Sequence, residues 1–578
     1  MEELLSVPGA PYRIAGAATG LGMSVGGLIG PYNTLLRYIE TYRPGVRPAL
    51  SLGALESIVN QQAGSGRAVR IGLLAACSAA AGLYALFIAR TAFRIGGITY
   101  FTLVDDAMVS MRYAQHLAHG SGLVWNIGQK PVEGFTNPAW MLLMAVFHLF
   151  PIPAAKVSLA VMIASALILL ANILVVYRLC AALRPAASLP PLLAAGITAL
   201  YFPLIFWSLR GMEVGLLVLL IDAAAWIAVR REGAIRPRDA AALGLLLSLA
   251  VLTRLDALIQ VFLILGFLAV TGKDRRRLLL PLLIVLLATA GILVFQRLYF
   301  GDLLPNTYYQ KMAGTDLWER LRNGLLMFIQ HAMWDTVLPA AFSFACLIFY
   351  KDFRRPGTLL LAALFAAQCA YSVWVGGDYA EPELDAANRF ITQGMPALII
   401  LFSLALDRVL NDPPLRLRAR PRARAVFGLA LSLIALAVMT GRPWLAWMDD
   451  NAPLLQADIR RTREGLFLAK YTTPEAVIAV HAAGQIPYYS GRTTIDLLGL
   501  NDPVIARGPV TGPFYPGHDK WNYDYSIRQL QPDLIADNWI KLAAYMKGET
   551  EYRRLGNGIY VRLDSTQIDI TGLSQEYR

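Results

Sequence analysis

Charged side chains are scarce in this sequence, and their scarcity excludes an ordinary soluble protein. Asp, Glu, Lys and Arg make up 16% of the 578 residues, hydrophobic residues make up 56%, and the mean hydropathy is +0.48. Soluble domains carry about 25% charged residues, so the composition predicts a polytopic α-helical membrane protein. The formal net charge of +12 does not indicate nucleic acid, because the Lys and Arg residues lie in short loops between apolar segments, where they set the orientation of membrane helices.

Cysteine is rare as well, and histidine forms no cluster. The four cysteines lie inside or at the edge of apolar segments: Cys77, Cys180, Cys346 and Cys369. This placement favours buried thiols over disulfides or a zinc site. We therefore expect no cofactor; a divalent metal is left open, although no residue pattern supports one. Residues 1–66 lack a basic start followed by a compact apolar core, so we expect no cleavable signal peptide.

Long apolar runs and the basic loops between them predict the membrane topology. Runs of roughly 17–25 apolar residues predict transmembrane helices, and clusters of Lys and Arg predict the cytoplasmic ends. About eleven spans result: 70–92, 154–179, 191–208, 214–229, 240–253, 257–270, 279–295, 332–349, 357–375, 392–406 and 426–440. Segment 138–151 is apolar but too short to cross, so the alternation of basic loops requires a re-entrant or surface-lying helix there.

Three regions follow from this topology. Residues 1–68 are predicted to be a cytoplasmic or interfacial extension, 69–441 the transmembrane part, and 442–578 an extracytoplasmic α/β domain. A length of about 130 residues is enough for a small domain. Within it we expect strands at 475–480, 494–498, 532–536 and 558–562, and helices around 456–468 and 539–545.

Two adjacent carboxylates, Asp105 and Asp106, follow the first span and precede a helical pattern at 107–118. The topology places them outside the cytoplasm, at the membrane surface. Ionisable groups held at that boundary are costly, which favours a functional role. The alternative is that they stabilise the positive end of the helix that follows them. The two roles are compatible.

Polar, aromatic and ionisable residues gather in the loops predicted to lie outside. Carboxylates and amides bind sugar hydroxyls, aromatic faces stack on sugar rings, and Arg or Lys bind phosphate; an Asp can act as general base. Asp105, Asp106 and Glu133 are the candidate catalytic residues. The candidate substrate-binding residues are Arg112, Trp125, Asn137, Trp207, Arg210, Glu213, Arg254, Asp256, Asn306, Tyr308, Lys311, Asp378 and Arg389. Alternatives remain open: the aromatic residues can be interfacial anchors, and Arg254 with Asp256 a mutually neutralising pair.

The order of these loops resembles a known family. The segments concerned are 105–107, 112–114, 122–126, 132–140, 207–208, 211–213, 301–307, 376–378, 389–390, 484–491 and 496–502. Together they resemble the external loops of bacterial integral-membrane glycosyltransferases of the GT-C class. Within that class, the loops are similar to those of the arabinofuranosyltransferase-like subgroup, which includes the terminal arabinofuranosyltransferases of mycobacterial cell walls. The fold class predicted is therefore a GT-C-like polytopic helical membrane protein with an extracytoplasmic α/β domain.

The resemblance implies a polyprenyl-phosphate-linked sugar as donor and transfer at the outer face of the bacterial cytoplasmic membrane. It implies that Asp105 or Asp106 acts in catalysis. We expect an inverting glycosyltransferase whose acceptor is an envelope glycan, lipid or protein; the sugar is arabinofuranose or another pentose or hexose. One alternative is a transporter or flippase of a lipid-linked sugar, which would need two related halves that the sequence lacks. The other is a non-catalytic envelope assembly protein.

Overall fold

The computed structural model describes residues 52–185, 187–233, 235–411, 421–536, 539–555 and 558–576. The predicted N-terminal extension falls largely on residues 1–51, outside the described residues. The chain divides into two compact units, Met1–Ser78 and Ala79–Arg578. Helix α4 (Leu52–Arg90) belongs to both units; everything else below concerns the second unit.

A helix of the structure lies at each predicted span. After α4 these are α7 (Ala154–Leu183), α8 (Leu189–Leu200), α9 (Phe202–Leu209), α10 (Val214–Arg230), α11 (Pro237–Thr253), η1 (Leu255–Ala257), α12 (Leu258–Thr271), α13 (Leu279–Tyr299), η3 (Met333–Val337), α16 (Leu338–Phe349), α17 (Pro356–Val375), α20 (Met395–Asn411) and α21 (Pro421–Asp450). Two further helices, η2 (Arg275–Leu278) and α15 (Leu317–His331), lie outside the predicted spans. Helix α21 continues past residue 441, the predicted end of the transmembrane part, so that boundary stays a prediction.

Fewer helices of the structure are long and apolar enough to cross a membrane than the number of spans predicted from the sequence. Among the described residues, four helices are long and apolar enough to cross: Val69–Arg90, Ala154–Leu183, Arg275–Tyr299 and Pro356–Val375. Two bent pairs, α8 with α9 and α15 with η3 and α16, raise the number to six if each pair is one span. The chain is therefore a multi-pass membrane protein, and the total of about eleven spans stays a prediction.

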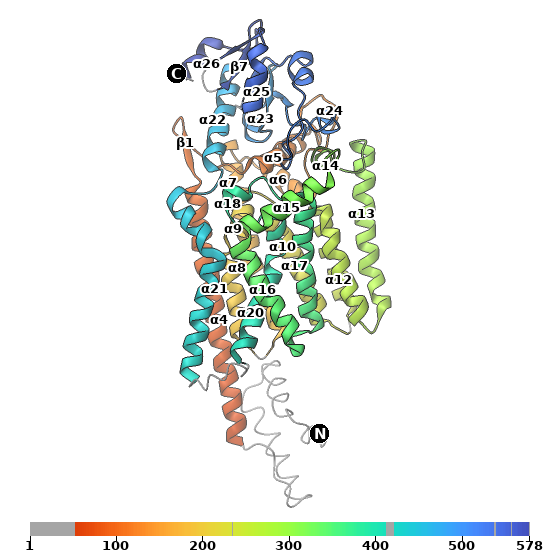
Figure 1. Cartoon of the computed structure of the whole chain (residues 1–578), viewed down its shortest axis with the longest axis vertical. Helices are drawn as coiled ribbons and strands as arrows, with labels where there is room; N and C mark the ends of the chain where they lie inside the picture. Colours follow the sequence, from red (N-terminus) through yellow and green to blue (C-terminus); the bar gives the residue numbers. More distant parts are fainter. Residues whose placement is uncertain are drawn as a thin grey trace, which may run out of the picture. The chain divides into compact units, whose positions relative to one another are not determined.

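Two short helices lie between the membrane helices and the C-terminal part of the chain (Figure 1). They are α5 (Asp105–Ala118) and α6 (Pro138–His148), which pack against each other. Helix α6 has 11 residues, so it is about 16 Å long and cannot cross a hydrocarbon core of about 30 Å. The prediction that segment 138–151 does not span is confirmed.

Smaller elements complete this layer. A hairpin of β1 (Phe93–Ile95) and β2 (Ile98–Tyr100) precedes α5. Its turn residues, Gly96 and Gly97, have φ of +55° and +80°, which suits the tight turn of a two-residue hairpin. The remaining short helices are α14 (Asn306–Met312), η4 (Lys351–Phe353), α18 (Glu381–Leu384) and α19 (Arg389–Thr392).

The C-terminal α/β region (Leu455–Glu576) is built on a five-stranded sheet. Its elements are α22 (Leu455–Tyr471), β3 (Val477–Val480), α23 (Gln485–Ser490), β4 (Thr493–Asp496), α24 (Pro503–Ala506), η5 (Asp524–Gln529), β5 (Leu534–Ala536), α25 (Ile540–Tyr545), η6 (Met546–Gly548), β6 (Tyr552–Arg554), β7 (Tyr560–Arg562) and α26 (Ile570–Glu576). The strand order is β4-β3-β5-β7-β6, with β3 parallel to β4 and β5 and the other pairs antiparallel.

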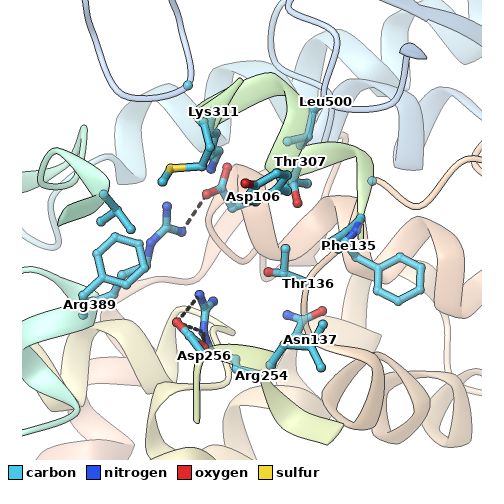
Figure 2. A pocket seen from close by; sticks show the side chains of 18 of the residues that line it. Asp106, Phe135, Thr136, Asn137, Arg254, Asp256, Thr307, Lys311, Arg389 and Leu500 are labelled. Carbon is cyan, nitrogen blue, oxygen red and sulfur yellow. Dashed lines mark hydrogen bonds and ion pairs between the residues drawn. The ribbon is translucent and has the colours of Figure 1, made fainter. Parts of the chain in front are cut away.

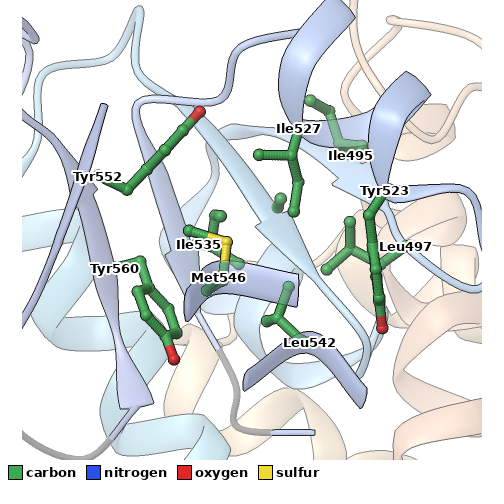
Figure 3. Close-up of a cluster of buried hydrophobic side chains, with 10 residues drawn as sticks. Ile495, Leu497, Tyr523, Ile527, Ile535, Leu542, Met546, Tyr552 and Tyr560 are labelled. Atoms are coloured by element: carbon green, nitrogen blue, oxygen red, sulfur yellow. The ribbon is translucent and has the colours of Figure 1, made fainter. Parts of the chain in front are cut away.

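Both faces of this sheet are covered. Ala479 of β3, in register with Ile495 and Ile535, faces one buried cluster together with Tyr523 and Leu542 (Figure 3). The flanking residues of β3 join the other cluster, as the alternation of side chains along a strand requires. The four predicted strands are confirmed within a few residues, and β6 was not predicted. That this region is an extracytoplasmic domain of its own stays a prediction.

A buried ion pair fastens the C-terminal α/β region to the membrane helices. The guanidinium of Arg210, directly after α9, lies 2.5 Å from Asp458 of α22, and the side chains are 0% and 1% exposed. Arg210 Nη1 also donates to the carbonyl oxygen of Thr102 at 2.8 Å. A buried pair contributes little net stability compared with apolar packing, but removing one partner leaves an uncompensated charge.

Asp458→Asn tests this attachment. The substitution keeps the shape of the side chain and leaves the charge of Arg210 unpaired, so we expect a loss of about 3–5 kcal/mol in the free energy of unfolding. Asp352→Asn is the matched control, because Asp352 is 58% exposed in its pair with Arg408 and should cost less than about 1 kcal/mol. The measurement is the thermal unfolding midpoint of both variants in detergent; equal midpoints would contradict the prediction.

Candidate active site

Asp105 opens helix α5 and holds the C-terminal α/β region by its side chain. The backbone N–H groups of Gly484 and Gln485 donate to Asp105 Oδ1, each at 3.1 Å. The approach requires glycine, because a Cβ at position 484 would lie 2.1 Å from the Asp105 carbonyl oxygen. Asp105 is therefore one of the points at which α5 meets the start of α23.

Asp106, the next residue of α5, forms an ion pair with Arg389. Arg389 Nη1 lies 2.7 Å from Asp106 Oδ2 (Figure 2). Arg389 Nε lies 3.0 Å from Asp378 Oδ2. Arg389 begins α19, a helix that Asn388 caps by accepting from the N–H groups of Phe390 and Ile391. The cap fixes the start of the helix, so the guanidinium is held between two carboxylates.

Lys311, in the last turn of α14, supplies a second cation beside Asp106. Within the part of the chain that the structure describes, its ammonium has no direct ion pair. Its stem approaches the Gly517 backbone, where an added Cβ would lie 3.1 Å from Lys311 Cε. Burial lowers the pKa of Lys311, and the charge of Asp106 opposes this.

The two neighbouring carboxylates titrate very differently. Burial raises the pKa of Asp105 to about 7, against the opposing charge of Arg461. Burial also acts to raise the pKa of Asp106, but the charges of Arg389 and Lys311 outweigh it and hold the pKa at about 2. Asp105 can therefore exchange a proton near neutral pH, whereas Asp106 stays ionised.

Two cavities adjoin at these residues. The first cavity, of about 230 Å³, lies beside Asp106, Lys311 and Arg389, with Arg254 and Asp256 on its other side (Figure 2). The second cavity, of about 310 Å³, extends from Asp105 and Asp106 into the C-terminal α/β region. The residues that line both are Asp106, Lys311, Tyr379, Leu500 and Gly517.

The first cavity combines charged groups with apolar walls. Arg254 binds Asp256 through two nitrogens at 2.9 Å and donates to Glu213 at 2.7 Å. Asn137 donates to Glu213 at 2.9 Å and accepts from Ser110 at 2.9 Å. The Arg254–Asp256 ion pair is thus present. Apolar lining comes from Met212, Leu255, Leu304, Met312, Val375 and Phe390.

Glu133 is the other carboxylate in this cavity. It is 4% exposed, and its two oxygens accept from Gln296 Nε2 at 3.1 and 3.0 Å. Burial raises the pKa of Glu133 to about 7, although the Gln296 hydrogen bonds oppose the rise. Tyr308 also lines this cavity and is 44% exposed.

Six of the predicted binding residues lie outside the lining of both cavities, and each has contacts of its own. Arg112 donates to the carbonyl oxygens of Trp125, Pro487 and Arg492 and to Asn126, so it joins α5 to the C-terminal α/β region. Asn306 donates to the carbonyl oxygens of Gly499 and Leu500. The ring of Trp207 lies 5.7 Å from the Arg389 guanidinium carbon. The six are Arg112, Trp125, Trp207, Arg210, Glu213 and Asn306; their roles in binding stay predictions.

Sequence reasoning missed several lining residues. Gln296 lies near the end of an apolar helix, and Tyr379 follows a predicted loop residue, Asp378. The others come from the C-terminal α/β region: Arg460, Arg461, His481, Asp496, His518 and Trp539. No local pattern distinguishes them, because only the packing of this region against α5 brings them to the cavity. Among the described residues no group of three or more His, Cys, Asp or Glu side chains could hold a metal ion.

The fold is similar to that of ArnT from Cupriavidus metallidurans. The apo structure of ArnT matches with a TM-score of 0.55 at 16% sequence identity, covering 85% of this chain and 97% of ArnT. ArnT bound to undecaprenyl phosphate matches with a TM-score of 0.54 at 13% identity, covering 85% and 98%. An apo oligosaccharyltransferase from Archaeoglobus fulgidus gives a TM-score of 0.47 at 13% identity, covering 74% and 64%. The likeness to ArnT shows a GT-C-like membrane fold.

Sequence comparison adds one local match. Residues 455–569 match a family described as a domain of unknown function, DUF8728. This stretch covers nearly all of the C-terminal α/β region. No curated protein sequence matches the chain.

Proposed function

We propose that this chain is a membrane glycosyltransferase that moves a sugar from a polyprenyl-phosphate donor to a glycan, lipid or protein of the cell envelope. The observation that carries the proposal is the position of the Asp pair. Asp105 and Asp106 open one helix at the junction of two cavities, with Arg389 and Lys311 beside them. Such a junction suits a reaction between two substrates that enter from different sides. A GT-C-like fold that is shared with an undecaprenyl-phosphate-bound structure supports the lipid donor.

The donor belongs in the first cavity. Its phosphate would lie against Lys311 and Arg389, whose donors suit phosphate oxygens, and its lipid along the apolar residues of the same cavity. Glu133, Asn137 and Asp256 line this cavity and offer acceptors for sugar hydroxyls. We do not assign the sugar beyond a pentose or hexose, and arabinofuranose is one member of that set.

The reaction is a single displacement with inversion. The acceptor hydroxyl gives its proton to the carboxylate of Asp105, and its oxygen forms a bond to the anomeric carbon. The bond between the anomeric carbon and the phosphate oxygen breaks, and the polyprenyl phosphate leaves with the electron pair. Arg389 and Lys311 stabilise the negative charge that develops on the leaving phosphate.

We assign the general base to Asp105 and the fixing of Arg389 to Asp106. A base works best when its pKa lies near the working pH, and the pKa of Asp105 is about 7 whereas that of Asp106 is about 2. Asp106 instead holds Arg389 in place beside the first cavity. Asp378, on the other side of the guanidinium, has the same effect.

The Asp105→Asn and Asp106→Asn variants test this division of roles. The kcat of the wild type should rise as the pH increases through about 7, the pKa of Asp105, because only the ionised carboxylate accepts a proton. Asp105→Asn should remove this rise and lower turnover by about 10²–10⁴-fold. Asp106→Asn should weaken donor binding and keep that rise. The measurement is release of undecaprenyl phosphate from a panel of undecaprenyl-phosphate pentoses and hexoses between pH 5 and 9. If both variants turn over like the wild type, neither residue is the base and the mechanism is wrong.

Arg389→Lys and Lys311→Ala test the phosphate contact. Lysine keeps the charge at position 389 but cannot bridge Asp106 and Asp378 while also facing a phosphate, so binding of undecaprenyl phosphate should weaken about tenfold or more. Lys311→Ala removes a cation that has no direct ion pair among the described residues, and a similar loss is expected. Arg297→Lys is the control, because Arg297 lies outside both cavities. Unchanged affinity in both test variants would remove the two residues from the site.

We further propose that the Asp pair and the C-terminal α/β region face away from the cytoplasm of a bacterial inner membrane, as the basic loops predict. A cysteine at position 130, an exposed residue between α5 and α6, should react with an impermeant thiol reagent in intact cells whose outer membrane, where present, is permeabilised. A cysteine at position 273, exposed between α12 and η2, should react only after lysis. The reverse pattern would invert the topology. The parent chain without an introduced cysteine is the control, because it shows how much the native cysteines are labelled.

A further inference from the structure

The second cavity is built largely by the C-terminal α/β region. Helix α22 contributes Arg460 and Arg461, the segment after β3 contributes His481, and Trp539 follows β5. Asp105 and Asp106, at the start of α5, line the same cavity. Residues of the stretch that matches a family of unknown function therefore share a cavity with the candidate base.

The carboxylates of this cavity are largely engaged by other groups. Asp496 accepts from the backbone N–H groups of Leu498, Gly499 and Asn501 and from the Asn501 side chain. Asp106 is paired with Arg389, which lies outside this cavity. Asp105 accepts from the backbone N–H groups of Gly484 and Gln485. Each of these three lining carboxylates thus already has donors or a cation of the protein beside it.

Two cations of the cavity have no carboxylate partner among the described residues. Lys311 has no direct ion pair there, and Arg460 is exposed and has none either. Arg461, by contrast, forms an ion pair with Asp458 at 3.6 Å. An anionic group in this cavity would meet Lys311 and Arg460 without displacing a carboxylate from them.

An aromatic side chain, Trp539, lines the same cavity as these cations. The half-buried Trp539 has its ring 5.0 Å from that of His481 and 5.1 Å from that of Trp521, which fixes its orientation. Two small residues, Ala482 and Ala483, also line this cavity. Aromatic faces of this kind support the apolar face of a sugar ring, while polar residues around it take the hydroxyls.

We propose that the second cavity is the acceptor site and that it takes an acidic saccharide, with the hydroxyl to be glycosylated toward Asp105 and a carboxylate or phosphate toward Arg460 and Arg461. The assignment rests on the proposed glycosyltransferase function, because it places the acceptor opposite the lipid donor. It gives the C-terminal α/β region a role in substrate selection.

The test compares two soluble probes that differ in charge. Trigalacturonic acid carries a carboxylate on each ring, and galactotriose is its neutral counterpart. Binding of each to the purified full-length protein is measured by saturation-transfer NMR and titration. We expect trigalacturonic acid to bind about tenfold or more tightly than galactotriose, the size of effect that charge-assisted hydrogen bonds give.

Arg460→Gln should remove most of this preference. Arg463→Gln is the matched control, because Arg463 lies on the same helix, is exposed and does not line the cavity; it should keep the preference. Equal affinity for the two probes, binding of neither, or a preference that survives in Arg460→Gln would overturn the proposal.

Binding of undecaprenyl phosphate to the same preparations separates this inference from the proposed function. If undecaprenyl phosphate binds and the acidic preference is absent, the acceptor assignment fails alone. If the acidic preference is present and undecaprenyl phosphate does not bind, the lipid donor fails and the cavity loses its role as an acceptor site. The proposal requires two results for Arg460→Gln. Undecaprenyl phosphate must bind to it as tightly as to the parent chain, and its preference for the acidic probe must be lost.

Discussion

The arrangement of the site depends on one guanidinium held between two carboxylates. Arg389 comes from α19, Asp106 from α5 and Asp378 from the loop after α17, so a single side chain joins segments that are up to 283 residues apart. Burial acts to lower the pKa of Arg389, but Asp378 and Asp106 outweigh burial and raise it. Burying such charges is acceptable only when they are paired, which means that the three segments must come together before any of the three charges is stable.

The C-terminal α/β region depends on the same helix for its attachment. Asp105 accepts from the Gly484 and Gln485 amides, and Arg112, two turns further along α5, donates to backbone carbonyls of the same region. Asp105 is an acceptor and Arg112 is a donor, so the two contacts cannot be exchanged, and together they favour one docking orientation of the region. Helix α5 therefore contacts the lining of the first cavity through Asp106 and the C-terminal α/β region through Asp105.

The sequence was sufficient for the features that follow from local patterns. The spans, the short helix α6 and four of the five sheet strands each have an apolar run or a length limit behind them. The hairpin β1–β2 also had a signal, the Gly96-Gly97 pair, which was overlooked. Partners of single charges could not be predicted: Asp458 lies 248 residues from Arg210, and Pro487 lies 375 residues from Arg112. Polarity and sidedness marked these arginines as candidates for ligand binding, yet the fold itself engages their charges.

Helix geometry explains how two adjacent aspartates acquire opposite properties. Successive residues of an α-helix point about 100° apart, so Asp105 and Asp106 cannot face the same surroundings. Asp105 turns to backbone amides and to Arg461, which stabilise its charge too little to overcome burial; Asp106 turns to a full ion pair with Arg389. Pairs of acids with pKa values pushed apart in this way divide proton transfer from charge stabilisation. In the proposed function, placing both aspartates at one helix start would put these two roles on adjacent residues, where two cavities meet.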